Sequence, residues 1–173
     1  MGAGLGASAA LCVVVATFCP YFGWIEEGSI YSFARGLEDL FHGEGFVCNS
    51  NKYTGSDGIW FERSGKRQPL KLNWQPHLYI SYCGQIGVTS ECVTQVKRLF
   101  LDNSSLAEKI DQDMRKAVYG VGDSLLLTES QGLPMLTNAL YSAGLCFQRW
   151  GLTKGAIGEH LQALTEAGAL AVK

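Results

Sequence analysis

The chain has 173 residues and a formal net charge of −2; 47% of its residues are hydrophobic and 17% are charged. Such a composition excludes an intrinsically disordered chain, and the length is enough to bury a substantial core. The slightly acidic balance excludes a general attraction to nucleic acid or anionic lipid, so either partner would require a local basic patch. We therefore expect one folded domain of ordinary size, with any binding surface confined to a small part of it.

The first 25 residues lack any charged side chain. Glu26 follows them directly, and the first basic residue is Arg35. A membrane span needs about 20 apolar residues, so the segment is long enough, and small residues spaced by four would let another helix approach it closely. The missing basic flank is atypical of both a secretory signal and an inserted span. We expect a membrane-like or signal-like segment at residues 1–25, a single domain at residues 26–173, and a location that is cytoplasmic or at a membrane.

A second interpretation places the same segment inside the protein. Val13, Val14 and Val15 are β-branched and favour a strand, which Pro20 would end. On this interpretation residues 10–18 form a buried strand. The sequence does not choose between a membrane-like segment and a core element.

Glycine is frequent at the start of the chain. The G-x-G-x-x-[GA] pattern of dinucleotide-binding turns is satisfied by Gly2-Ala3-Gly4-Leu5-Gly6-Ala7. That turn needs a preceding strand to direct it at the phosphates, and no strand fits before residue 2. We therefore predict no cofactor.

The middle of the chain changes from helical to strand-like patterning. After Ser29, apolar side chains recur at the spacing of one helix face, and Gly43 and Gly45 would end that helix. Short aromatic and aliphatic runs separated by turn-forming residues then predict strands at 46–48, 59–62, 70–74 and 78–82. An antiparallel meander is the simplest arrangement of these strands.

Helical patterning returns in the second half. Apolar spacing predicts helices at 90–101 and 133–150, and a short strand at 123–128. Between them, Ser105 and Glu108 form a capping-box pattern at the start of a further helix. The expected fold class is α+β: an N-terminal apolar segment, a helix, a small antiparallel sheet, and a mainly helical C-terminal half.

The stretch 151–170 contains a glycine turn, a capping threonine and aliphatic residues at helical spacing. It resembles the turn and recognition helix of winged helix-turn-helix regulators. The resemblance implies that Thr153 caps the helix. It also implies that Lys154, Gly155 and Gly158 face a DNA major groove. DNA is the partner this favours, and a protein partner or a membrane remains the alternative.

The cysteines suggest a different chemistry. No two of the six form a C-x-x-C pair and the chain has only three histidines, so we predict no metal site. Cys83 follows a predicted strand and precedes Gly84, a setting in which thiol hydrolases hold a nucleophile. Such a thiol needs a neighbouring base, which only His42, His77 or His160 can supply, and we name His77 as the candidate.

Three functional hypotheses follow. The first is a non-enzymatic binding or regulatory protein that contacts DNA through the helix-turn-helix-like stretch. The second is a membrane-attached or exported α+β protein without a nucleic-acid role. The third is a thiol hydrolase that uses Cys83.

Overall fold

The structure is a computed structural model that describes residues 7–42, 58–61, 67–85 and 87–173. The chain divides into two compact units. The first unit comprises Met1–Thr54 and Ile86–Cys92, and the second comprises Gly55–Gln85 and Val93–Lys173.

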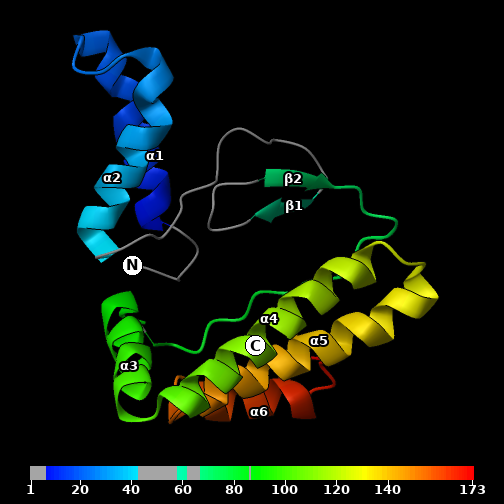
Figure 1. The fold of residues 1–173 in the computed structure, drawn as a ribbon. Helices are drawn as coiled ribbons and strands as arrows, with labels where there is room; N and C mark the ends of the chain where they lie inside the picture. Colours follow the sequence, from blue (N-terminus) through cyan, green and yellow to red (C-terminus); the bar gives the residue numbers. More distant parts are fainter. Residues whose placement is uncertain (1–6, 43–57, 62–66, 86) are drawn as a thin grey trace. The chain divides into compact units, whose positions relative to one another are not determined.

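The first unit is built on a helical hairpin (Figure 1). Its elements in chain order are α1 (Ala7–Phe18), the 3-10 turns η1 (Cys19–Phe22) and η2 (Glu27–Ser29), and α2 (Ile30–His42). The buried centre of the hairpin consists of Cys12, Ala16 and Ala34, and Ile30 and Leu37 pack against it. Because the three central side chains are small, the two helices approach each other closely. The helix expected after Ser29 is confirmed as α2.

The strand expected at residues 10–18 is wrong, because these residues lie in α1. Cys12, Ala16 and Cys19 are buried, and their spacing of four and three residues follows one helix face. Packing against α2 buries that face and stabilises the helix, and tertiary contact of this kind overrides the β-propensity of the valines. Within the described ranges, no helix is both long enough and apolar enough to cross a membrane.

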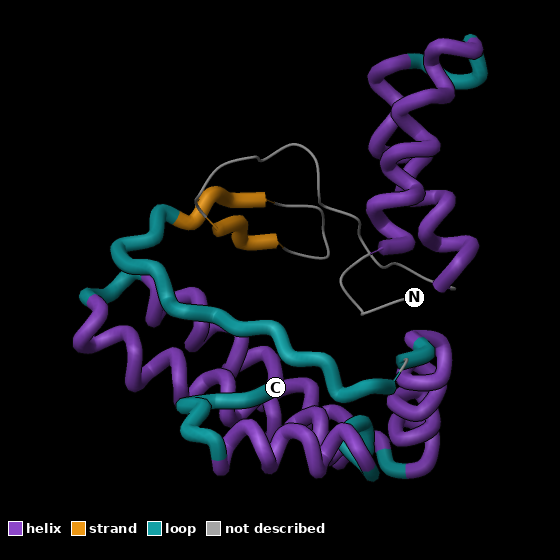
Figure 2. Tube along the Cα trace, turned by 180° about the vertical axis from the view of Figure 1, so that it is seen from behind, coloured by secondary structure: helices purple, strands orange, loops and turns teal. Residues whose placement is uncertain are grey.

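The second unit is centred on a pair of long helices. Its elements in chain order are β1 (Gly58–Phe61), β2 (Arg67–Leu70), most of α3 (Thr89–Asp102), α4 (Ser104–Leu125), α5 (Glu129–Arg149) and α6 (Ala156–Glu166). Helices α4 and α5 run side by side along their lengths (Figures 1 and 2). Small residues dominate their buried faces, which include Ala107, Ala117, Ala139, Ala143 and Cys146. The helices expected at 90–101 and 133–150 are confirmed as α3 and α5.

The expected α+β class is wrong, because the protein is mainly helical. Within the described residues the only sheet is an antiparallel pair, in which Gly58 of β1 lies opposite Leu70 of β2 and Phe61 lies opposite Arg67. Strand β1 confirms the strand expected at 59–62. The strands expected at 70–74 and 78–82 are wrong, except that Leu70 is the last residue of β2. The strand expected at 46–48 and the glycines expected to end α2 lie outside the described residues.

The residues after β2 do not continue the sheet because two of them, Asn73 and Trp74, are hydrogen-bonded to the end of α4. The amide of Asn73 donates to the carbonyl of Leu125 over 3.1 Å. The indole Nε1 of Trp74 donates to the carbonyl of Ser124 over 2.9 Å. These bonds satisfy carbonyls at the C-terminal end of a helix, which have no partner within the helix itself. A continued strand could not direct both residues at the helix end.

Two local predictions around α4 are also wrong. The strand expected at 123–128 is the last turn of α4 and the turn after it, where the Leu126 amide donates to the Asp123 carbonyl. The helix begins one residue before the expected cap, Ser105. Its cap is Asn103, whose Oδ1 accepts from the Leu106 amide over 3.1 Å. Asparagine competes well with serine at this position because its side-chain carbonyl oxygen accepts from the same backbone amides as the serine hydroxyl does.

The hairpin of β1 and β2 is attached to α4 through Trp60. The ring centroids of Trp60 and Tyr119 are 5.1 Å apart. One turn further along α4 the ring lies against Gly122, where an added Cβ would come within 2.7 Å of it. A residue with a side chain at that position would displace the indole, so the glycine makes this contact possible.

Gly132 should be indispensable to the junction between α4 and α5. A Cβ added there would collide with the Ser124 carbonyl oxygen and lie 2.6 Å from Trp74 Nε1. We expect Gly132→Ala to lower the free energy of unfolding by about 1–3 kcal/mol, as overpacking does, in urea denaturation followed by circular dichroism.

The matched control is Gly36→Ala in α2, where an added Cβ meets no atom within 4 Å. There the better helix propensity of alanine should raise stability by up to about 1 kcal/mol. Equal effects of the two substitutions would contradict the packing described at Gly132.

Candidate functional site

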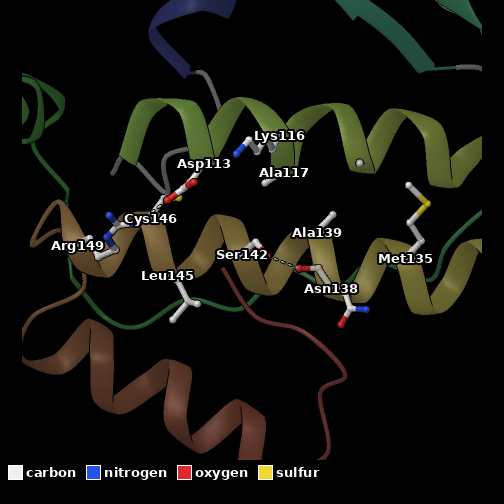
Figure 3. A pocket seen from close by; sticks show the side chains of 11 residues that line it. Asp113, Lys116, Ala117, Met135, Asn138, Ala139, Ser142, Leu145, Cys146 and Arg149 are labelled. Atoms are coloured by element: carbon white, nitrogen blue, oxygen red, sulfur yellow. Dashed lines mark hydrogen bonds and ion pairs between the residues drawn. The ribbon is translucent and has the colours of Figure 1, made fainter. Parts of the chain in front are cut away.

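A groove of about 400 Å³ lies between α4 and α5 (Figure 3). Asp113 and Lys116 line it from α4, and Asn138, Ser142 and Arg149 line it from α5. The rest of the lining is mostly small or apolar. The groove therefore combines an apolar floor with charged groups toward one end.

An ion pair connects the two walls of the groove. Arg149 Nη1 donates to Asp113 Oδ2 over 2.7 Å, and each side chain is 35% exposed. The hydrogen bond from Arg149 and the guanidinium charge hold the pKa of the Asp113 carboxyl below its usual range. Lys116 adds a second cation to the same lining. The charged end of the groove thus holds one ion pair and one further cation.

The groove is lined by one hydroxyl group and one thiol group, and each donates a hydrogen bond to a backbone carbonyl. Ser142 Oγ donates to Asn138 O over 2.9 Å, and Cys146 Sγ donates to Ile110 O over 3.7 Å. Burial raises the pKa of the Cys146 thiol, and the nearby Asp113 charge raises it further. A thiol of this kind is a packing group and not a nucleophile.

A second cavity, of about 200 Å³, contains the thiol singled out by its sequence setting. Ser81 and Cys83 line it together with Phe147 of α5, His160 of α6 and Lys173. Ser81 Oγ and His160 Nε2 are 2.9 Å apart and share a hydrogen bond. The Lys173 ammonium lies 5.0 Å from the centre of the Phe147 ring.

The two catalytic candidates are not brought together. Cys83 is half-buried in the second cavity, whereas His77 is exposed and is not part of its lining. The histidine in that cavity is His160, and its Nε2 is engaged with Ser81. No sequence pattern predicted the contact between Ser81 and His160, because pairing across 79 residues leaves no local signal in a sequence. The thiol hydrolase remains a prediction, with His160 in place of His77 as the nearby base.

The four residues assigned to DNA binding, Thr153 as the helix cap and Lys154, Gly155 and Gly158 as groove-facing residues, divide into two pairs. Lys154 and Gly155 are exposed, and Gly155 has a φ of 63°. Thr153 and Gly158 are partly buried against each other, since a Cβ on Gly158 would lie 2.5 Å from the Thr153 carbonyl oxygen. Thr153 makes no side-chain cap, because α6 begins after Gly155 without one. The turn before α6 therefore depends on the positive φ of Gly155 and not on a hydrogen bond to the Thr153 hydroxyl.

The first unit has a smaller hollow, of about 280 Å³, lined by Thr17, Pro20, Tyr21, Glu27 and Ile30. One carboxylate is present in that lining. Over the described parts of the chain, no group of three or more histidine, cysteine, aspartate or glutamate side chains is arranged to hold a metal ion.

The Asp113–Arg149 pair predicts a specific dependence of stability on pH. Because its pKa is lower in the folded protein, Asp113 stabilises the fold above the ordinary aspartate pKa of about 4, and this contribution is lost as the pH falls through the lowered value. Asp113→Asn should therefore be less stable than wild type at about pH 6, and the difference should vanish in strong acid. Urea denaturation across this pH range measures it.

Asp111→Asn provides the control. Asp111 pairs with Arg115 one turn along the same helix, but these side chains are 41% and 73% exposed. Solvent screens such a pair, so its removal should change stability less than the removal of Asp113. A larger loss for Asp111→Asn would contradict the role assigned to Asp113.

Comparisons with known proteins give one informative similarity. No family model matches the chain, and no solved structure matches it. The chain is 26% identical over 177 residues to a protein named mevalonate kinase from Pyrococcus horikoshii (strain ATCC 700860 / DSM 12428 / JCM 9974 / NBRC 100139 / OT-3). The similarity covers all of this chain and 52% of that protein. The chain thus spans about half the length of the curated relative it matches.

Proposed function

We propose that this chain forms part of a small-molecule kinase, which transfers a phosphoryl group from a nucleoside triphosphate to an alcohol. The observation that carries the proposal is the extent of the similarity to mevalonate kinase, which runs over the whole chain at 26% identity. A similarity caused by one apolar helix or one glycine-rich run would cover only that segment. The chain spans about half of its relative, so the proposal concerns only the part of such a kinase that this chain would form.

The glycine-rich start supports a role in binding phosphate. The sequence Gly2 to Gly6 leads directly into α1, which begins at Ala7. Backbone amides at the beginning of a helix point along its axis and favour a bound anion, and glycines allow phosphate oxygens to approach the backbone. This role rests on the amides at the start of a helix and on the small size of glycine, and not on the strand that a dinucleotide-binding turn requires.

The proposal predicts that the chain binds ATP with magnesium, measured by isothermal titration calorimetry. Gly4→Asp should weaken binding at least about tenfold, because a carboxylate in the phosphate position repels the ligand, and tenfold corresponds to about 1.4 kcal/mol. Gly28→Asp adds the same charge to the first unit where an added Cβ meets no atom within 4 Å, and it should bind as wild type does. Absence of binding by the wild-type chain, or equal binding by Gly4→Asp, would refute the assignment.

DNA binding by the helix-turn-helix-like end is the second candidate. The observation in its favour is that α6 follows α5 across a short turn, with Lys154 exposed at the start of α6. The exposed side of α6 carries Glu159 and Glu166, which repel phosphate. We favour the kinase for this reason.

The test of the second candidate is retardation of duplex DNA at low salt. DNA binding through this turn should fall steeply as salt rises and should be lost in Lys154→Glu. Glu166→Lys is the opposite change on the same helix and should strengthen binding. Salt-insensitive behaviour of all three proteins would exclude a DNA contact at α6.

A further inference from the structure

The cavity of about 200 Å³ in the second unit contains a serine that is paired with a histidine. Ser81 Oγ and His160 Nε2 are 2.9 Å apart, and both residues line the cavity. Apolar side chains, among them Phe147, Leu152 and Leu161, make up much of the remaining lining. A hydroxyl within hydrogen-bonding distance of an imidazole is the arrangement that activates a serine for attack on a carbonyl group, because the histidine accepts its proton.

The two members of the pair are held in different ways. His160 lies within α6, which fixes its backbone. Ser81 lies in the loop after β2, which Asn73 and Trp74 attach to the end of α4 and which runs beside the helices of the second unit (Figure 2). Ser81 is exposed, whereas His160 is half-buried. The base is thus positioned by a helix, and the hydroxyl is accessible to a substrate.

The same cavity offers donors for a developing negative charge. Thr153 and Lys173 belong to its lining and supply a hydroxyl and an ammonium group. The ammonium lies 5.0 Å from the centre of the Phe147 ring. The preceding residue approaches α5 closely at Gly144, where an added Cβ would lie 3.1 Å from the Val172 carbonyl oxygen. Donors of this kind stabilise the oxyanion that forms when a serine attacks a carbonyl carbon, and the described lining includes no aspartate or glutamate to repel it.

We propose that Ser81 and His160 form a nucleophile and base pair that hydrolyses a small carboxylic ester. Ser81 Oγ attacks the carbonyl carbon of the ester, and its proton passes to His160 Nε2, which accepts it in the tautomer that carries a hydrogen on Nδ1. His160 gives this proton to the alcohol that leaves as its bond to the carbonyl carbon breaks. A water molecule, whose proton His160 takes, then attacks the acyl group on Ser81. The acid is released, and the proton returns to Ser81.

The base selects Ser81 and not Cys83, although both residues line the cavity. The hydrogen bond of His160 Nε2 is made with the Ser81 hydroxyl, and the proton moves along that bond. The small volume and the apolar part of the lining favour a short apolar acyl group. This hydrolysis is distinct from the phosphoryl transfer proposed above and does not depend on it.

The test combines hydrolysis of p-nitrophenyl butyrate by the full chain with labelling by a fluorophosphonate. In the labelling reaction Ser81 Oγ bonds to phosphorus as fluoride leaves, and mass spectrometry of the peptides locates the adduct. We expect the adduct on Ser81. Ser81→Ala should lose it, and Ser81→Ala and His160→Gln should each hydrolyse the ester at least about a hundredfold more slowly, because a positioned base contributes about 10²–10⁴-fold.

The matched control is Ser130→Ala. Ser130 is exposed as Ser81 is, but its hydroxyl lies 3.2 Å from the Thr128 hydroxyl and not beside an imidazole. This variant should keep the labelling and the hydrolysis of the wild type. Glutamine at position 160 still offers Ser81 a hydrogen-bonding side chain, so His160→Gln removes the base and not merely the contact. Circular dichroism verifies that each variant is folded.

Three results would overturn the proposal. The first is a wild-type chain that carries no adduct on Ser81. The second is labelling and hydrolysis that persist in His160→Gln, since the histidine would then not be the base. The third is ester hydrolysis that survives in Ser81→Ala, and its abolition by iodoacetamide would assign the reaction to Cys83.

Discussion

The second unit depends on the close packing of α4 against α5. Ile110 is fully buried between the helices, and the thiol of Cys146 donates to its carbonyl. Alanines along the interface remove the bulk that would separate the two helices. Their alignment places Arg149 within hydrogen-bonding distance of Asp113 and leaves the groove between the walls. Without that alignment neither the ion pair nor the groove would exist.

The same helix pair fixes the position of the chain that precedes it. Asn73 and Trp74 attach to the end of α4, and Gly132 leaves room for the indole between the two helices. From there the chain runs beside α5 and α6, where Ser81 meets His160. Ser81 is held by this attachment, whereas Leu78, Tyr79, Ile80 and Tyr82 are exposed. Their exposure is thus a consequence of how the helix end is satisfied.

The sequence by itself determined the elements whose side-chain period matches their burial. Helices α2, α3 and α5 and strand β1 were predicted correctly because an apolar face repeats along each of them. Only the tertiary structure decided that residues 10–18 are helical and that residues 70–74 leave the sheet. In both cases a distant partner, α2 for the first and the end of α4 for the second, supplies more free energy than local propensity does. The pairing of Ser81 with His160 has the same origin, because the fold brings together residues that no local pattern connects.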